Sequence, residues 1–244
     1  MDWTKAKTII IAALLLTNIV ILGAWMAKAH DGARGDEDAT LRAILSSGGI
    51  FLETELPKKP GRMAVLYVQP ETNDAAAVRR ALAAQEALSS ATLSDEGLAA
   101  AADAILESCG YMDESAEIAL PPERDGGRAY VRYRDVFDGI PIEEGYIVCE
   151  FEGSRAVGVD RKWYTPVELH DRKGEIITPL RALIQLLGDK EGDDSLIIRG
   201  IELVYWVSPQ GVSEGSPVAD TALPAWKITD SEGTTRYIAA YEQS

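Results

Sequence analysis

Histidine and cysteine are scarce in this 244-residue chain, which has two of each. Two His and two Cys leave no margin for a four-ligand zinc site, and two Cys exclude a dense disulfide scaffold. Basic residues are also in deficit, because 24 Lys and Arg face 39 Asp and Glu, for a formal net charge of −15. We expect no nucleic-acid binding, since neutralising phosphates requires an excess of Lys and Arg.

Motifs that carry catalysis are missing as well. The chain contains no GxGxxG, GxxxxGK[ST], HExxH or EF-hand loop. His30 lies in a predicted linker and His170 in a predicted turn, so neither a Ser-His-Asp nor a Cys-His apparatus is expected. Glu143 and Glu144 are adjacent on a predicted strand and point to opposite faces, so they cannot flank a glycosidic bond together. We predict no enzymatic activity, no cofactor and no metal.

Hydrophobic residues make up 46% of the chain, an ordinary share for a globular protein, but they are unevenly placed. Residues 8–27 carry no charge, and twenty helical residues span about 30 Å, the thickness of the hydrocarbon core. Lysines flank both ends, and Trp3 and Trp25 occupy the positions of an aromatic belt. We predict a single transmembrane helix, with residues 1–7 as a cytoplasmic tail.

A secretory signal peptide is the competing interpretation of this segment, because Ala27-Lys28-Ala29 fits a small-x-small cleavage site. Lys28 just before the cut weakens that fit, and the apolar run is long for a signal peptide. Both interpretations export the rest of the chain. Asn18 is the polar side chain in mid-span, either tolerated there or bonded to another helix.

The charge divides sharply at this segment. The first 35 residues carry four basic and two acidic side chains, so the remaining 209 carry 20 and 37, a net charge of −17. Residues 28–38 are polar and contain glycine, as is typical of a linker. The exported body is not expected to adhere to an anionic lipid surface.

The body has the patterning of an α+β protein. Asp74, Ser94 and Thr178 are predicted helix N-caps. Apolar periodicity and turn residues predict helices over 39–47, over 74–88, from 94 to 109 and from 178 to 187. Alternation predicts strands near 50–54, 63–68, 128–136, 143–152, 155–165, 196–207, 223–229 and 234–241.

Two stretches repeat one order of elements. Residues 94–165 and 178–241 each show a helix followed by three strands, which indicates tandem α-β-β-β units, with antiparallel sheets because hairpins join the strands. We expect an N-terminal segment over 39–92, followed by units over 93–166 and 177–244 within 93–244. The loop 208–222 is predicted to be disordered or to contact a partner.

Two further groups of residues carry open interpretations. Cys109 and Cys149 fall on core faces of one unit and form either a disulfide or two buried thiols. Helix-on-sheet packing often separates Cα atoms too far for a bridge. Aromatic residues gather in the later strands; most are expected in the core, and any left exposed would suit protein recognition: Trp163, Tyr164, Tyr205, Trp206, Trp226, Tyr237 and Tyr241.

Several segments in order resemble the YycI family, single-pass membrane proteins found with the WalK/WalR (YycG/YycF) two-component system of low-GC Gram-positive bacteria. The start MDWTKAKTI before one apolar span containing Asn18-Ile19 is the most specific. Tyr237-Ile238-Ala239-Ala240 departs mildly, since Asn is usual where Ala239 lies. The other matching segments are IFLETELP (50–57), IPI (140–142), ITPLRAL (177–183), IELVYW (201–206) and PAWKI (224–228).

This resemblance implies an uncleaved anchor in the cell membrane, a cytoplasmic N-terminus and an extracytoplasmic α+β body. It implies a non-enzymatic regulator of cell-wall homeostasis that acts with a YycH-like protein on a WalK-like sensor histidine kinase. The transmembrane helix would contact the kinase, with Leu14, Thr17, Asn18 and Ile21 as candidate contacts. The alternative is an exported binding or inhibitory module whose N-terminal segment is only a signal peptide.

Overall fold

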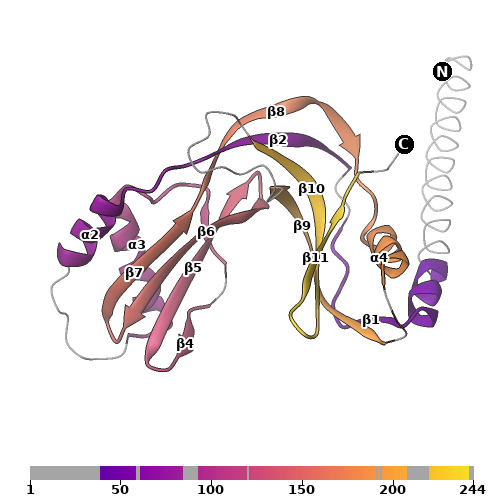
Figure 1. Cartoon of the computed structure of the whole chain (residues 1–244), viewed down its shortest axis with the longest axis horizontal. Coiled ribbons are helices and arrows are strands. Elements are labelled where there is room, and N and C mark those ends of the chain that lie inside the picture. Colours follow the sequence, from indigo (N-terminus) through magenta and orange to yellow (C-terminus); the bar gives the residue numbers. More distant parts are fainter. Residues whose placement is uncertain are drawn as a thin grey trace, which may run out of the picture.

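The computed structural model describes residues 39–58, 61–84, 93–119, 121–190, 192, 194–207 and 220–241. These ranges form an arch with two lobes and a crown (Figure 1). No helix within them has the length and hydrophobicity needed to cross a bilayer. The predicted tail 1–7, span 8–27 and linker 28–38 lie outside the described residues.

Lobe 1 contains two helices on one face of a set of strands. The helices are α2 (Ala75–Ala84) and α3 (Asp95–Cys109). The strands are β3 (Ala116–Ile118), β4 (Glu123–Asp125), β5 (Arg128–Phe137), β6 (Ile140–Glu152) and β7 (Arg155–Lys162).

Lobe 2 contains the helical residues 39–47, helix α4 (Pro179–Gly188) and four strands. The strands are β1 (Ile50–Leu52), β9 (Leu196–Val207), β10 (Asp220–Asp230) and β11 (Thr235–Ala239). The crown is an antiparallel ribbon of β2 (Arg62–Pro70) and β8 (Tyr164–Glu175).

One mixed sheet passes through both lobes in the order β3-β5-β6-β9-β10-β2-β8, with β4, β7, β1 and β11 paired to its members. The α+β class is therefore confirmed. The prediction of antiparallel sheets is wrong at two places, because β1 and β6 both pair with β9 in parallel. Hairpins fix only the pairing of neighbouring strands, and these two parallel pairs join segments far apart in the chain.

The predicted helix caps are confirmed in detail. The Asp74 carboxylate accepts hydrogen bonds from the amides of Ala76 and Ala77 at 2.8 and 3.0 Å. The Ser94 hydroxyl accepts from Gly97 N at 3.2 Å, and the Thr178 hydroxyl accepts likewise at the start of α4. These side chains satisfy amide groups that a helix N-terminus leaves without partners.

The core of lobe 1 lies between the helices and β5–β7. Alternation along the strands turns one set of side chains toward α2 and α3 and leaves the other set on the opposite face. The buried set includes Val131, Tyr133, Ile147, Cys149 and Phe151, with Leu98, Ala102 and Leu106 from α3.

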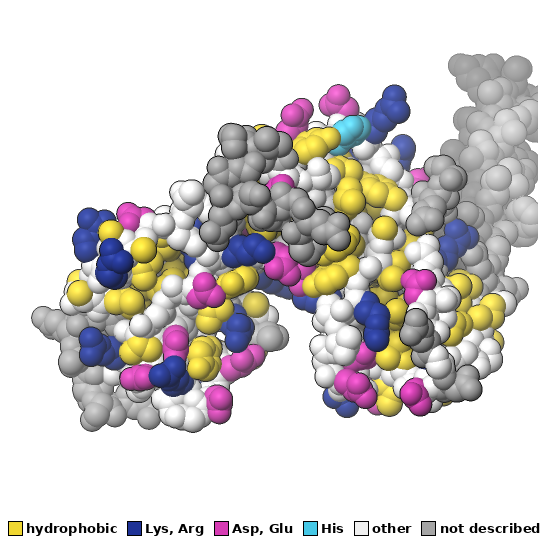
Figure 2. All heavy atoms as spheres, viewed as in Figure 1, with side chains coloured by type: hydrophobic (Ala, Val, Ile, Leu, Met, Phe, Trp, Pro, Cys, Tyr) yellow, Lys and Arg dark blue, Asp and Glu magenta, His cyan; other side chains and the backbone are white. Residues whose placement is uncertain are grey.

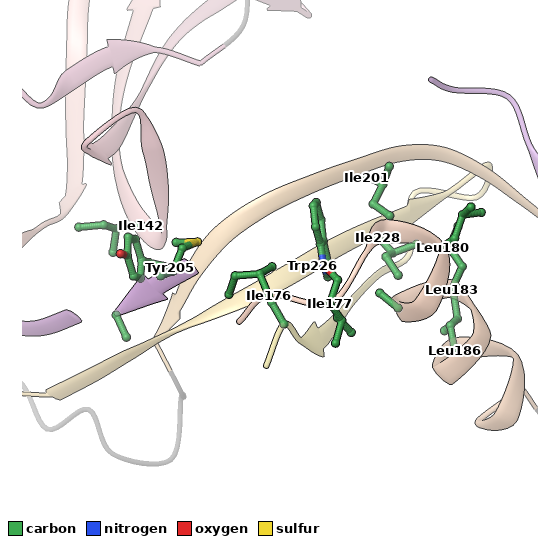
Figure 3. Close-up of a cluster of buried hydrophobic side chains, with 14 of the residues drawn as sticks. Ile142, Ile176, Ile177, Leu180, Leu183, Leu186, Ile201, Tyr205, Trp226 and Ile228 are labelled. Atoms are coloured by element: carbon green, nitrogen blue, oxygen red, sulfur yellow. The ribbon is translucent and has the colours of Figure 1, made fainter. Parts of the chain in front are cut away.

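The core of lobe 2 lies between α4 and the strands β9 and β10 (Figure 3). Leu180, Leu183 and Leu186 project from one face of α4 as the predicted apolar stripe. They belong to one buried cluster with Trp226, whose indole N–H donates to the Ile177 carbonyl at 3.1 Å. This bond satisfies the one polar group of a fully buried side chain.

The crown corrects the prediction that His170 lies in a turn. Residues 164–175 form strand β8, and the strand predicted over 155–165 ends at Lys162 and resumes at Tyr164. Most of β8 is exposed on both faces, so it lacks the alternation from which strands are predicted. The loop predicted over 208–222 ends earlier, because β10 begins at Asp220, and residues 208–219 lie outside the described ranges.

Candidate partner-binding groove

A groove lies where the lobes meet beneath the crown, and Figure 2 shows the molecule hollowed between the lobes. Helices cover the outer faces of both sets of strands, so the uncovered faces look into this hollow (Figure 1). The groove has a volume of 440 Å³. Its walls include Arg132, Arg134, Tyr146 and Val148 from lobe 1 and Glu202 and Lys227 from lobe 2.

Ion pairs link the two lobes across the groove. Arg134 lies 2.9 Å from Glu202, and Lys227 lies 2.7 Å from Glu143. The first pair joins β5 to β9, and the second joins β6 to β10. The Glu143–Lys227 pair is the better shielded, because the two side chains are 16% and 29% exposed. The walls therefore carry balanced charges that are already fixed in place.

An aromatic pair lies beside these charges on lobe 2. The rings of Trp206 and Tyr237 are stacked with their centroids 5.6 Å apart and their planes 10° from parallel. The Tyr237 hydroxyl donates to Glu143 at 2.8 Å. Burial and this carboxylate raise the pKa of Tyr237, so the hydroxyl remains a donor. Both rings are only half-buried, whereas Trp163, Tyr164, Tyr205 and Trp226 are core residues, as expected.

A bulge in β6 places the carboxylates at the groove. Arg134 pairs with Tyr146, but the next residue of β5, Asp135, pairs with Ile142. Residues 143–145 are therefore extra on β6, and Glu144 adopts a left-handed conformation with φ of 73°. Such bulges bend a strand and redirect its side chains. Glu143 consequently reaches Lys227, while Glu144 pairs with Lys162 at 3.1 Å.

Gly145 is the residue that permits this bulge. A Cβ at this position would lie 2.7 Å from Asp135 Cβ and 3.1 Å from the Ile142 carbonyl oxygen. We expect Gly145→Ala to lower the free energy of unfolding by about 1–3 kcal/mol, measured by urea denaturation. Gly158→Ala is the control, since a Cβ there meets nothing closer than 3.6 Å. Equal effects of the two variants would contradict a tight fit at Gly145.

The predicted site residues fall partly outside the described ranges. Leu14, Thr17, Asn18 and Ile21 are not among the described residues. Cys109 ends α3 and Cys149 lies on β6, both against the core of lobe 1. They are free thiols, the second of the two interpretations left open. Burial raises the pKa of both, that of Cys149 to about 12, so neither is an activated nucleophile.

The sequence did not predict the groove. Glu143 and Glu144 were expected on opposite faces of a regular strand, and the bulge that turns them to different lysines has no local signature beyond Gly145. Arg134, Glu202 and Lys227 are ordinary strand charges until the pairing of β6 with β9 brings them together. Only the aromatic residues Trp206 and Tyr237 carried a signal, because Trp and Tyr are enriched where proteins bind one another.

No protein-family model matches the chain, and no curated protein does so either. In the part of the chain that the structure describes, no group of three His, Cys, Asp or Glu side chains could hold a metal ion. The groove offers Arg and Tyr side chains in its walls and the Trp206–Tyr237 stack beside it, and these three residue types most often dominate protein–protein binding energy.

Proposed function

We propose that this protein is a membrane-anchored, non-enzymatic regulator that binds other proteins through the groove between its lobes. Its partners would be a WalK-like sensor histidine kinase and a YycH-like protein, as the resemblance to the YycI family suggests. The span 8–27 would hold the N-terminus in the cytoplasm and the body outside, with Leu14, Thr17, Asn18 and Ile21 available to the kinase.

The observation that carries the proposal is the half-buried Trp206–Tyr237 stack beside fixed charges. The Tyr237 hydroxyl donates a hydrogen bond to Glu143, and Glu143 forms an ion pair with Lys227. An aromatic surface whose side chains are already ordered loses little conformational entropy when a partner binds. The order of elements matches the predicted tandem units in part: α4 leads directly into β9–β11, whereas the short strands β3 and β4 lie between α3 and β5–β7.

The test is capture of the kinase and of the YycH-like protein by the full chain in membranes. We expect Trp206→Ala to weaken capture of at least one of them about ten-fold or more, as for a central interface residue. Phe51→Ala is the matched control, because Phe51 is a 47% exposed aromatic on β1 of the same lobe. Equal capture by both variants would show that the groove is not the interface.

A second experiment concerns the membrane segment. Replacing residues 8–27 by a poly-Leu span keeps an anchor but removes the polar and small side chains. We expect the kinase to be lost from the complex while the body remains folded. Kinase output that is unchanged when the protein is deleted would contradict the regulatory role.

The alternative function is an exported binding or inhibitory module. The small-x-small sequence at 27–29 favours it, and in that case the mature protein begins at His30. The intact mass of the protein recovered from cells distinguishes the two, since an anchor retains residues 1–29.

A further inference from the structure

We propose that a second site, on the crown, binds a phosphate group. It is a hollow of 760 Å³ lined by basic side chains of β2 and β8, which we call the crown hollow: Arg62, His170, Arg172 and Lys173, with Gly174 and Tyr241. The inference is independent of the partner proposed for the groove, because the crown hollow is made of other residues.

Three cations without an ion pair line the crown hollow together. Arg62, Arg172 and Lys173 form no ion pair with any residue that the structure describes, although Asp171 belongs to the lining and Glu175 lies opposite Arg62 in the β2–β8 pairing. Elsewhere in the acidic body most arginines are held by carboxylates, as at Arg124, Arg128, Arg132, Arg134, Arg161, Arg199 and Arg236. Three unpaired cations around one concavity fit an anion.

The imidazole of His170 adds a directed donor. The backbone amide of Arg172 donates to His170 Nδ1 at 3.1 Å, so in the neutral ring the proton is on Nε2. The Tyr67 ring packs against the imidazole with centroids 6.4 Å apart. The imidazole is thus held from two sides, with its N–H free to meet an anion.

The floor of the hollow is rigid. A Cβ at Gly174 would lie 2.5 Å from the edge of the Tyr241 ring, so the ring rests directly on the β8 backbone. The Tyr241 hydroxyl donates to the Met63 carbonyl at 3.3 Å. The lining supplies two guanidinium groups, an ammonium and an imidazole, which are groups that suit a tetrahedral anion with several oxygens, and Arg forks suit it best.

The body's net charge restricts the size of the ligand. A body of net −17 repels a long polyanion, whereas one phosphate on a small molecule or on a lipid headgroup needs only local positive charge. Val167 and Leu169 are exposed further along β8, at 55% and 39%. The shared chemistry is therefore a single phosphate, and the experiment separates the soluble source from the lipid source.

Because the chain has only two histidines, the signals of the His170 imidazole can report phosphate binding directly. The full chain, labelled at its two histidines and held in phosphatidylcholine discs, is titrated with inorganic phosphate at constant pH and ionic strength. We expect a saturable shift of the His170 imidazole signals. We expect Arg172→Gln/Lys173→Gln to weaken binding about ten-fold or more, whereas Arg155→Gln, which removes an exposed charge on β7, leaves it unchanged.

Discs containing phosphatidylglycerol, without inorganic phosphate, identify the source. A His170 shift in these discs assigns the site to a lipid headgroup, and a shift with inorganic phosphate alone assigns it to a soluble phosphate. No shift in either arm, or a shift equal in the double variant, would overturn the proposal.

Discussion

Asp135→Asn is expected to stabilise the protein at pH 7 by up to about 3 kcal/mol and to have little effect near pH 4. The Asp135 side chain is fully buried at the β6 bulge. Its Oδ2 accepts a long hydrogen bond of 3.4 Å from Tyr164 N, and Oδ1 has no partner. Burial raises its pKa from 3.8 to about 6, assisted by the nearby charges of Asp113 and Glu71, while Ser115 and Tyr164 oppose the shift.

Whether ionisation of Asp135 stabilises or destabilises the fold depends on which state, folded or unfolded, binds the proton more tightly. Below about pH 4 the carboxyl is protonated in both states and its burial carries no charge penalty. Between pH 4 and pH 6 the unfolded chain releases the proton first, so folding becomes less favourable as the pH rises. Raising the pKa of Asp135 from 3.8 to about 6 corresponds to ~3 kcal/mol of stability. Asn cannot ionise, so the variant escapes this loss.

Urea denaturation of the full chain at several pH values measures the effect. The quantity compared is the difference in free energy of unfolding between variant and wild type, which removes the contributions of other carboxylates. Asp125→Asn, on the exposed strand β4, is the control and should follow the wild type at every pH. A difference for Asp135→Asn that is the same at pH 4 and pH 7 would show that Asp135 is not the titrating group.

Arg161→Ala should lower the free energy of unfolding by about 2–4 kcal/mol. The side chain is 4% exposed and ion-paired with Glu71 at 2.5 Å. Its guanidinium lies 4.3 Å from the Tyr111 ring centroid and 5.6 Å from that of Trp163. Removing one partner of a buried pair costs ~3–5 kcal/mol, and the expected loss is smaller here because Glu71 is 36% exposed.

The same variant should loosen α2 before the rest of lobe 1. Asn73, just before α2, donates to the Arg161 carbonyl at 2.6 Å and accepts from its guanidinium at 3.3 Å. Hydrogen exchange should therefore rise first over residues 75–84. Arg161→Lys should recover part of the stability, because it keeps the charge but loses the planar stacking. Arg155→Ala on the same strand should change little, and comparable losses for both arginines would contradict the role of burial.

Local signals in the sequence predicted the helices best. Asp74, Ser94 and Thr178 cap helices as expected, because capping depends on one side chain and the amides two or three residues later. Strand β8 was missed because its exposed faces give no alternation. The parallel pairing of β6 with β9 was missed because register between distant segments depends on tertiary packing, not on neighbouring residues.

The candidate site was predicted only through its aromatic residues. Trp206 and Tyr237 were among the seven aromatics considered for recognition, but nothing in the sequence separated them from Trp226 or Tyr205, which are buried. Asp135 was not singled out either. A carboxylate on a strand is ordinarily exposed, and its burial follows from the bulge that closes over it.

The arch has a mechanical consequence. Ile142 and Glu143 of β6 pair with Tyr205 and Trp206 of β9, and this is the whole of the pairing between those two strands. Each lobe, by contrast, has its own packed core and long hairpins. Each lobe is therefore held by its own core, whereas the join between the lobes consists of this short strand pairing, two ion pairs and the side chains of Phe137, Ile140 and Ile142, which pack in the core of lobe 2. A partner that spreads the groove must separate these groups and break the Tyr237–Glu143 hydrogen bond, which couples occupancy of the groove to the distance between the lobe tips.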